Sequence, residues 1–163
     1  MTTNDPAHVP AHVPAPVQRI SLPEQAAGFY RAMIDLDRAA RAGIEPSLAE
    51  LVKIHASAIN GCAFCLDMHT TDARKGGEQE HRLATLPAWR EAPWYTARER
   101  AALALTESVT LVTQGHVPDA VYDEAAKHFD QQELAQLIAL IIAINSWNRI
   151  AITSRMSPSP KQA

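Results

Sequence analysis

The sequence predicts an all-α fold of about six to seven helices, with no sheet. Capping patterns recur along the chain, apolar residues return at intervals of three and four positions, and no segment alternates with a period of two. The chain has 163 residues, 47% of them apolar and 20% charged, which is ordinary for a single globular domain with a buried core. We expect that domain to span residues 21–155.

The two flanks have a different character. Residues 1–20 are rich in proline and repeat Ala-His-Val-Pro, so they predict a flexible arm that cannot form a helix. Residues 156–163 contain Pro158 and Pro160 and predict a disordered tail.

Each element of the domain is predicted from start and stop signals. Four patterns typical of helix N-termini precede runs with helical spacing, namely Ser21-x-x-Glu24, Ser47-x-x-Glu50, Thr96-x-x-Glu99 and Asp130-x-x-Glu133. Glycines and prolines mark the breaks between helices. In order, the predicted helices cover about 21–43, 47–60, 62–76, 78–86, 96–115, 118–129 and 131–153, with a loop at 87–95.

The last predicted helix is apolar on most of its circumference between Leu134 and Ile152. One interpretation is a central core helix. A small domain offers little cover for a helix that is apolar on nearly all sides, so we favour a core helix that also forms a subunit interface.

Charge and composition exclude several classes of partner. The net charge is −3 and the basic residues are scattered, so we expect neither nucleic acid nor a membrane surface as a partner. The start lacks the pattern of a signal peptide, and the longest apolar run, residues 137–144, is far shorter than the roughly 20 residues of a membrane span. The protein is therefore predicted to be cytoplasmic, where a disulfide is more often catalytic or sensory than structural.

Chemistry is concentrated at Cys62-x-x-Cys65-x-x-x-His69. On a helix these side chains share one face, and Cα atoms three positions apart lie roughly 5 Å from each other, within reach of a disulfide. A helix N-terminus stabilises a thiolate, and His69 lies one turn beyond Cys65. This spacing favours Cys65 as the attacking sulfur and Cys62 as the resolving one, although the thioredoxin pattern would reverse the two roles.

Other interpretations of these residues remain open. The two cysteines and His69 could hold zinc with a fourth ligand from His55, His81 or Glu50, or the cysteines could be inert core residues. Glu50 could be only the third helical residue of its capping box. His55 lies on an apolar helix face, where a hydrogen-bonded core residue is commoner than a catalytic one, and it is a second-tier candidate.

The arrangement of Glu50, followed twelve residues later by Cys62-x-x-Cys65-x-x-x-His69, resembles the signature of the AhpD-like alkylhydroperoxidases of the carboxymuconolactone decarboxylase superfamily. The resemblance extends from about residue 22 to residue 155 and includes Trp89-Arg-Glu and Ile144-Asn-Ser-Trp-Asn-Arg149. It implies an AhpD-like helical fold that assembles into trimers or hexamers, with the active site close to a subunit interface.

The resemblance also implies a reaction. Cys65 would reduce a small hydroperoxide and then form a disulfide with Cys62, with Glu50 and His69 as a proton relay and without a cofactor or a metal. An external dithiol, from a lipoyl group or a thioredoxin-like protein, would restore the pair. Phe64 stands where the best-studied branch has a second His, so a relay through that His is absent. The alternatives are a non-enzymatic redox sensor, a zinc-stabilised module, and a decarboxylase, although the name-giving decarboxylases lack the dithiol.

Overall fold

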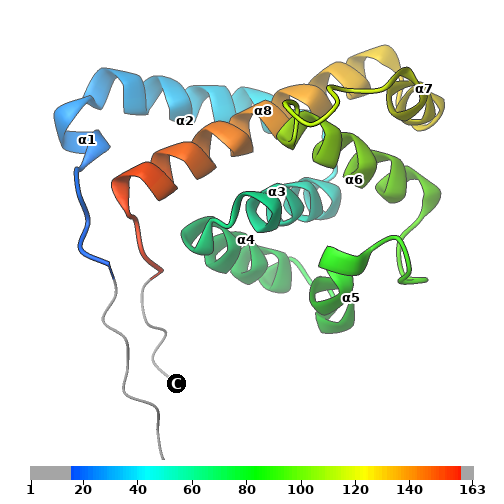
Figure 1. Ribbon diagram of the computed structural model, residues 1–163, viewed down its shortest axis with the longest axis horizontal. Coiled ribbons are helices and arrows are strands. Elements are labelled where there is room, and N and C mark those ends of the chain that lie inside the picture. Colours follow the sequence, from blue (N-terminus) through cyan, green and yellow to red (C-terminus); the bar gives the residue numbers. More distant parts are fainter. Residues whose placement is uncertain (1–15, 159–163) are drawn as a thin grey trace, which may run out of the picture.

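A computed structural model describes residues 16–158, and within this range all regular structure is helical (Figure 1). This confirms the predicted all-α class. The range contains eight α-helices, one more than the upper prediction, because the first predicted helix is interrupted at Ala26. The elements are α1 (Leu22–Gln25), α2 (Ala27–Arg41), α3 (Pro46–Asn60), α4 (Ala63–Lys75), α5 (Glu80–Thr85), the 3-10 turn η1 (Leu86–Ala88), α6 (Ala97–Thr110), α7 (Asp119–His128) and α8 (Gln131–Ser154).

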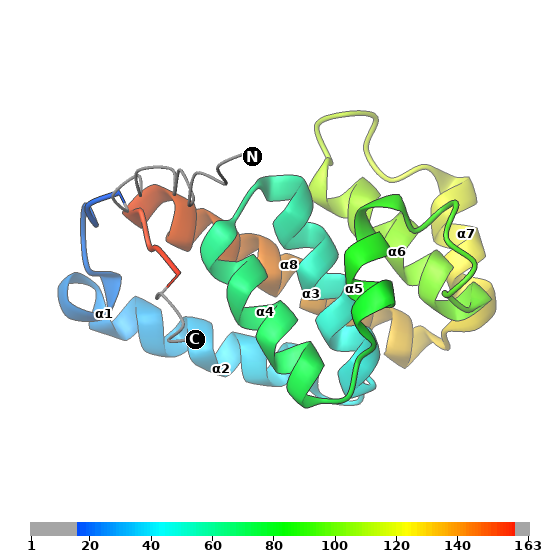
Figure 2. The ribbon, with the colours of Figure 1, turned by 90° about the horizontal axis from the view of Figure 1, so that it is seen from below.

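The helices are arranged around α8 and α3. In Figure 1, α2 and α8 cross the upper side of the molecule, α3 and α4 lie beneath them, and α6 with α7 closes one end. Seen from below, α4 and α5 lie in front of α3 (Figure 2). Because α3 contacts α4, α6 and α8, its side chains reach the interior in several directions.

The central position of α8 agrees with its apolar sequence. Leu137, Leu140 and Ile141 are completely buried, whereas Ile142 and Ile152 are about half exposed. By length and composition this helix could also cross a membrane, but more than half of its most apolar stretch is buried in the fold. Such a helix is typical of a protein core as well as of a membrane span.

Two of the four predicted capping boxes form. Thr96 with Glu99 and Asp130 with Glu133 make both reciprocal hydrogen bonds. The capping boxes predicted at Ser21 and Ser47 are wrong. Pro46 starts α3 one residue early, because proline suits the first helical turn, and Ser47 instead donates a hydrogen bond to Glu78 at 3.0 Å.

The described ends of the chain lie next to each other (Figure 1). The backbone N–H of Arg19 donates to the carbonyl of Ser154 at 2.9 Å, which joins the entering segment to the end of α8. Most of the predicted N-terminal arm, residues 1–15, and residues 159–163 of the predicted tail lie outside the described range.

Candidate functional site

A tight turn between α3 and α4 positions the cysteine pair. Gly61 has a left-handed backbone with φ of 69°, and the N–H of Cys62 donates to the carbonyl of Ser57 at 2.9 Å. The chain therefore reverses within one residue, and Cys62 becomes the N-cap of α4. The predicted helix break and restart at this point are confirmed.

Cys62 and Cys65 are free thiols on one side of the first turn of α4, and each is 1% exposed. The Cys62 sulfur accepts a hydrogen bond from the backbone N–H of Cys65 at 3.4 Å. The Cys65 thiol and further donors from Cys65, Asn148 and Phe64 lower the pKa of Cys62 to about 7, although burial opposes them. The pKa of Cys65 is raised, because its thiol donates to Cys62 and is buried.

His69 and Glu50 form the second part of the site. Nδ1 of His69 lies 2.8 Å from Oε2 of Glu50, and the imidazole is buried. Burial pushes the pKa of Glu50 upward, but the hydrogen bond from His69 and the nearby positive charges of Lys53 and Arg41 outweigh it, so the pKa lies below its usual value. The packing of α4 on α3 brings this pair together across 19 residues of sequence. No hydrogen bond joins His69 to either sulfur within the described residues.

Lys53 belongs to this cluster, and the sequence interpretation missed it. Its side chain is completely buried, its ammonium lies 3.6 Å from Oε1 of Glu50, and Nζ has no hydrogen-bond partner in the described range. Burial lowers the pKa of Lys53, whereas the charge of Glu50 opposes this effect. The available signal was a lone lysine between Val52 and Ile54 in an otherwise apolar part of the helix.

Asn148 is a second residue with an unpredicted place in the site. Its side chain donates to Ser57 at 3.0 Å, accepts from Asn60 at 2.9 Å, and lowers the pKa of both cysteines. Asn148 therefore ties α8 to the turn that carries the dithiol.

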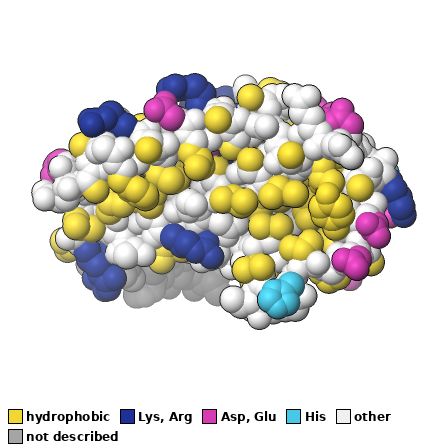
Figure 3. Space-filling model, turned by 90° about the horizontal axis from the view of Figure 1, so that it is seen from above, with side chains coloured by type: hydrophobic (Ala, Val, Ile, Leu, Met, Phe, Trp, Pro, Cys, Tyr) yellow, Lys and Arg dark blue, Asp and Glu magenta, His cyan; other side chains and the backbone are white. Residues whose placement is uncertain are grey.

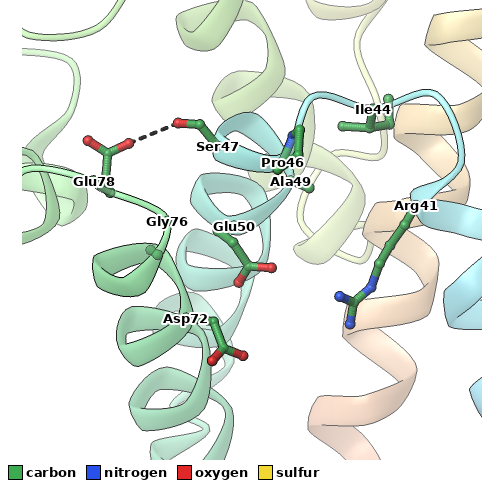
Figure 4. A pocket seen from close by; sticks show the side chains of 10 residues that line it. Arg41, Ile44, Pro46, Ser47, Ala49, Glu50, Asp72, Gly76 and Glu78 are labelled. Carbon is green, nitrogen blue, oxygen red and sulfur yellow. Dashed lines mark hydrogen bonds between the residues drawn. The ribbon is translucent and has the colours of Figure 1, made fainter.

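Three hollows reach different members of the site. Glu50 opens into a cavity of about 340 Å³, where Arg41 and Asp72 also point inward (Figure 4). His69 lines a neighbouring cavity of about 240 Å³, and Arg41 lines both. Aromatic and sulfur-containing side chains surround the His69 cavity, among them Tyr30, Phe64, Met68, Trp147 and Met156. Cys62 lines a third hollow, which shares Phe64 and Met156 with the second.

His55 is not part of this cluster. Its Nε2 lies 3.0 Å from Oε1 of Glu107 on α6, and Glu107 also accepts hydrogen bonds from Trp89 and Arg90. His55 is therefore a buried, hydrogen-bonded residue facing α6. Among residues 16–158, no group of three or more His, Cys, Asp or Glu side chains is arranged to bind a metal ion.

The part of the chain that carries these residues matches a known family. A family model described as "Carboxymuconolactone decarboxylase family" matches residues 27–108, which include Glu50, the dithiol and His69. The chain belongs to the carboxymuconolactone decarboxylase family. This confirms the family predicted from the sequence motif.

Two known proteins resemble the chain over most of its length. The uncharacterised protein YdfG of Bacillus subtilis is 44% identical over 136 residues, which cover 83% of this chain and 92% of YdfG. The crystal structure of ATU0492 from Agrobacterium tumefaciens, a protein of unknown function whose name links it to the antioxidant defence protein AhpD, superposes with a TM-score of 0.87. It shares 34% identity and covers 89% of this chain and all of its own.

A more distant structure shares the fold. A peroxidase-related protein with an alkylhydroperoxidase AhpD core, from Ralstonia eutropha JMP134, superposes with a TM-score of 0.72 at 22% identity. The superposition covers 85% of this chain and 74% of that protein. Together these structures confirm the predicted AhpD-like helical fold.

Proposed function

We propose that this protein is a thiol-dependent peroxidase that reduces small hydroperoxides with Cys62 and Cys65. Its partners are the hydroperoxide and an external dithiol reductant, either a lipoyl group or a thioredoxin-like protein. We place it in the cytoplasm as a homo-oligomer, a trimer or a hexamer. The observation that carries the proposal is a helix-capping thiol with a pKa of about 7, paired with a second thiol one turn away and close to a buried Glu–His pair.

The reaction divides into three balanced steps. His69 first takes a proton from the thiol pair. The Cys65 thiolate attacks the terminal oxygen of the hydroperoxide, the O–O bond breaks to leave a sulfenic acid on Cys65, and the alkoxide takes the proton from His69 and leaves as an alcohol. Cys62 then attacks the sulfenic sulfur of Cys65, and water leaves as the disulfide forms. The external dithiol reduces this disulfide by exchange and is itself oxidised.

The roles of the two sulfurs follow from separate arguments. The family resemblance assigns the attack to Cys65, whose proton can pass to Cys62 along the thiol–thiol hydrogen bond. The lower pKa of Cys62 favours the reverse assignment, because the thiolate is the nucleophile. Because the two thiols share a hydrogen bond, the first proton lost from the pair can leave the thiolate on either sulfur, and the family resemblance decides the assignment.

Single-cysteine variants test the proposal and the assignment together. We expect Cys65→Ser to abolish peroxide consumption in the presence of excess dithiol. Cys62→Ser should consume one equivalent and retain a sulfenic acid at Cys65, detectable by dimedone labelling and mass spectrometry. Unchanged peroxide consumption in Cys65→Ser would reject the assignment, and a wild-type protein that consumes no peroxide would reject the function.

The hydrogen bonds of Asn148 link the dithiol turn to α8, which also carries exposed apolar side chains such as Ile142, and this link favours a second candidate, a redox sensor that changes its assembly when the disulfide forms. A sensor reacts once and stops, whereas an enzyme turns over. Steady-state consumption with excess reductant therefore separates the two, because a sensor consumes one equivalent only.

A further inference from the structure

We infer that Lys53 is a positioning residue whose buried ammonium balances the charge of Glu50, so that His69 stays neutral and keeps Nε2 free to accept a proton. The inference rests on the proposed function, since the proton concerned is that of the thiol pair. It assigns a role to a residue that does not touch the dithiol and acts only through Glu50.

The geometry places Lys53 and His69 on opposite oxygens of one carboxylate. The Lys53 ammonium lies 3.6 Å from Oε1 of Glu50, and Nδ1 of His69 lies 2.8 Å from Oε2. Glu50 and Lys53 are one turn apart on α3, so the helix itself holds them on the same side. One negative charge thus lies between two basic groups.

Stability alone gives no reason for a lysine at this position. The side chain is 0% exposed, and its Nζ makes no hydrogen bond among residues 16–158. A buried ammonium without hydrogen bonds is costly, and an apolar side chain of similar size would avoid that cost. The charge is therefore the property that distinguishes Lys53 from its apolar neighbours.

Other charges near Glu50 are largely paired among themselves. Arg41 of α2 makes an ion pair with Asp37 at 2.7 Å, although both also act on the cluster through space. In the cavity of Figure 4, Asp72 of α4 pairs with Lys75 at 3.4 Å. Among these charged groups, Lys53 is the cation that forms an ion pair with Glu50.

The protonation of His69 follows from this balance. If Lys53 were neutral, the partly buried carboxylate would attract a second proton to the imidazole, and both ring nitrogens would then be donors. An imidazolium cannot accept a proton from a thiol. With Lys53 charged, the carboxylate is already balanced, and a neutral ring can donate from Nδ1 while Nε2 stays available.

The test measures the imidazole directly and needs no peroxide. In ¹⁵N-labelled protein, we expect Lys53→Met to move the midpoint of the His69 ring titration upward by roughly one pH unit, since a nearby positive charge is lost. Lys53→Arg keeps the charge and should return the midpoint toward the wild-type value. An unmoved midpoint in folded Lys53→Met overturns the inference.

A second comparison tests the inference if the Lys53→Met variant does not fold. Lys53→Gln removes the charge but keeps a polar side chain, so its His69 ring should titrate at higher pH than that of Lys53→Arg, which keeps the charge beside Glu50. Equal midpoints in these two variants also overturn the inference. Absence of peroxide turnover in the wild-type protein would instead reject the proposed function and leave these midpoints unaffected, so the two failures are distinguishable.

Discussion

Cys62 and Cys65 differ chiefly in their hydrogen bonds, because the Cys62 sulfur is an acceptor and the Cys65 thiol is a donor. Cys62 caps α4 and accepts hydrogen bonds from the N–H and the thiol of Cys65 and from Asn148, all of which favour a thiolate. Cys65 lies inside the first turn, where its thiol is a donor to Cys62. Two identical side chains three positions apart therefore have pKa values shifted in opposite directions.

This difference predicts the pH dependence of alkylation. The thiolate is the reactive form, so the rate at Cys62 should rise about tenfold per pH unit up to a pH of about 7 and then level off. Peptide mapping by mass spectrometry after brief iodoacetamide treatment measures each cysteine separately. The urea-unfolded chain is the control, and its Cys62 should level off nearly two units higher. A native profile that still rises above pH 8 would contradict the prediction.

Single residues were predictable where the helix period alone decides their neighbours. Cys62 and Cys65 share a helical turn, so their proximity followed from spacing. The spacing also places Lys53 one turn from Glu50, but the complete burial of Lys53 and the contacts of Asn148 depend on how α3, α4 and α8 pack against one another. Sequence spacing does not specify such packing.

At the scale of elements, the turn between α3 and α4 decides where the dithiol lies. Gly61 closes α3 in the left-handed conformation, and its N–H donates to Ala58 at 3.1 Å. A Cβ at this position would meet no atom within 4 Å, so any cost of substitution comes from the backbone conformation.

We therefore expect Gly61→Ala to lower the free energy of unfolding by about 1 kcal/mol. Gly28→Ala is the matched control, because Gly28 lies in α2 with an ordinary φ and equally open surroundings. It should raise the free energy of unfolding by up to about 1 kcal/mol. Urea denaturation measures the free energy of unfolding of both variants. Equal changes in the two would show that a side chain at position 61 does not strain the left-handed backbone.

Capping boxes were predictable where a single start signal was present. Thr96 and Asp130 each precede a helix without a competing signal, and both cap as the sequence predicts. At the start of α3, Ser47 competes with Pro46, and proline prevails because its fixed φ suits the first turn. Glu50 is thereby released from capping and can bond to His69.

At the scale of the whole molecule, α2 and α8 carry an apolar surface that the rest of residues 16–158 does not cover. Figure 3 shows a band of apolar side chains across this side. Ile142 is 50% exposed and Leu36 is 43% exposed, and both line a shallow hollow of about 480 Å³. Exposed apolar surface of this kind is typical of interfaces between subunits.

We expect this surface to form contacts between copies of the chain. Ile142→Glu would bury a carboxylate at such a contact, which costs about 2 kcal/mol per interface and weakens association roughly thirtyfold. Sedimentation velocity at micromolar concentrations should show smaller species for this variant than for the wild-type protein. Trp94→Glu is the control, because Trp94 is 47% exposed but lies in the connection between η1 and α6, outside α2 and α8. A monomeric wild-type protein, or equal sedimentation of wild type and Ile142→Glu, would show that the α2/α8 surface does not hold subunits together.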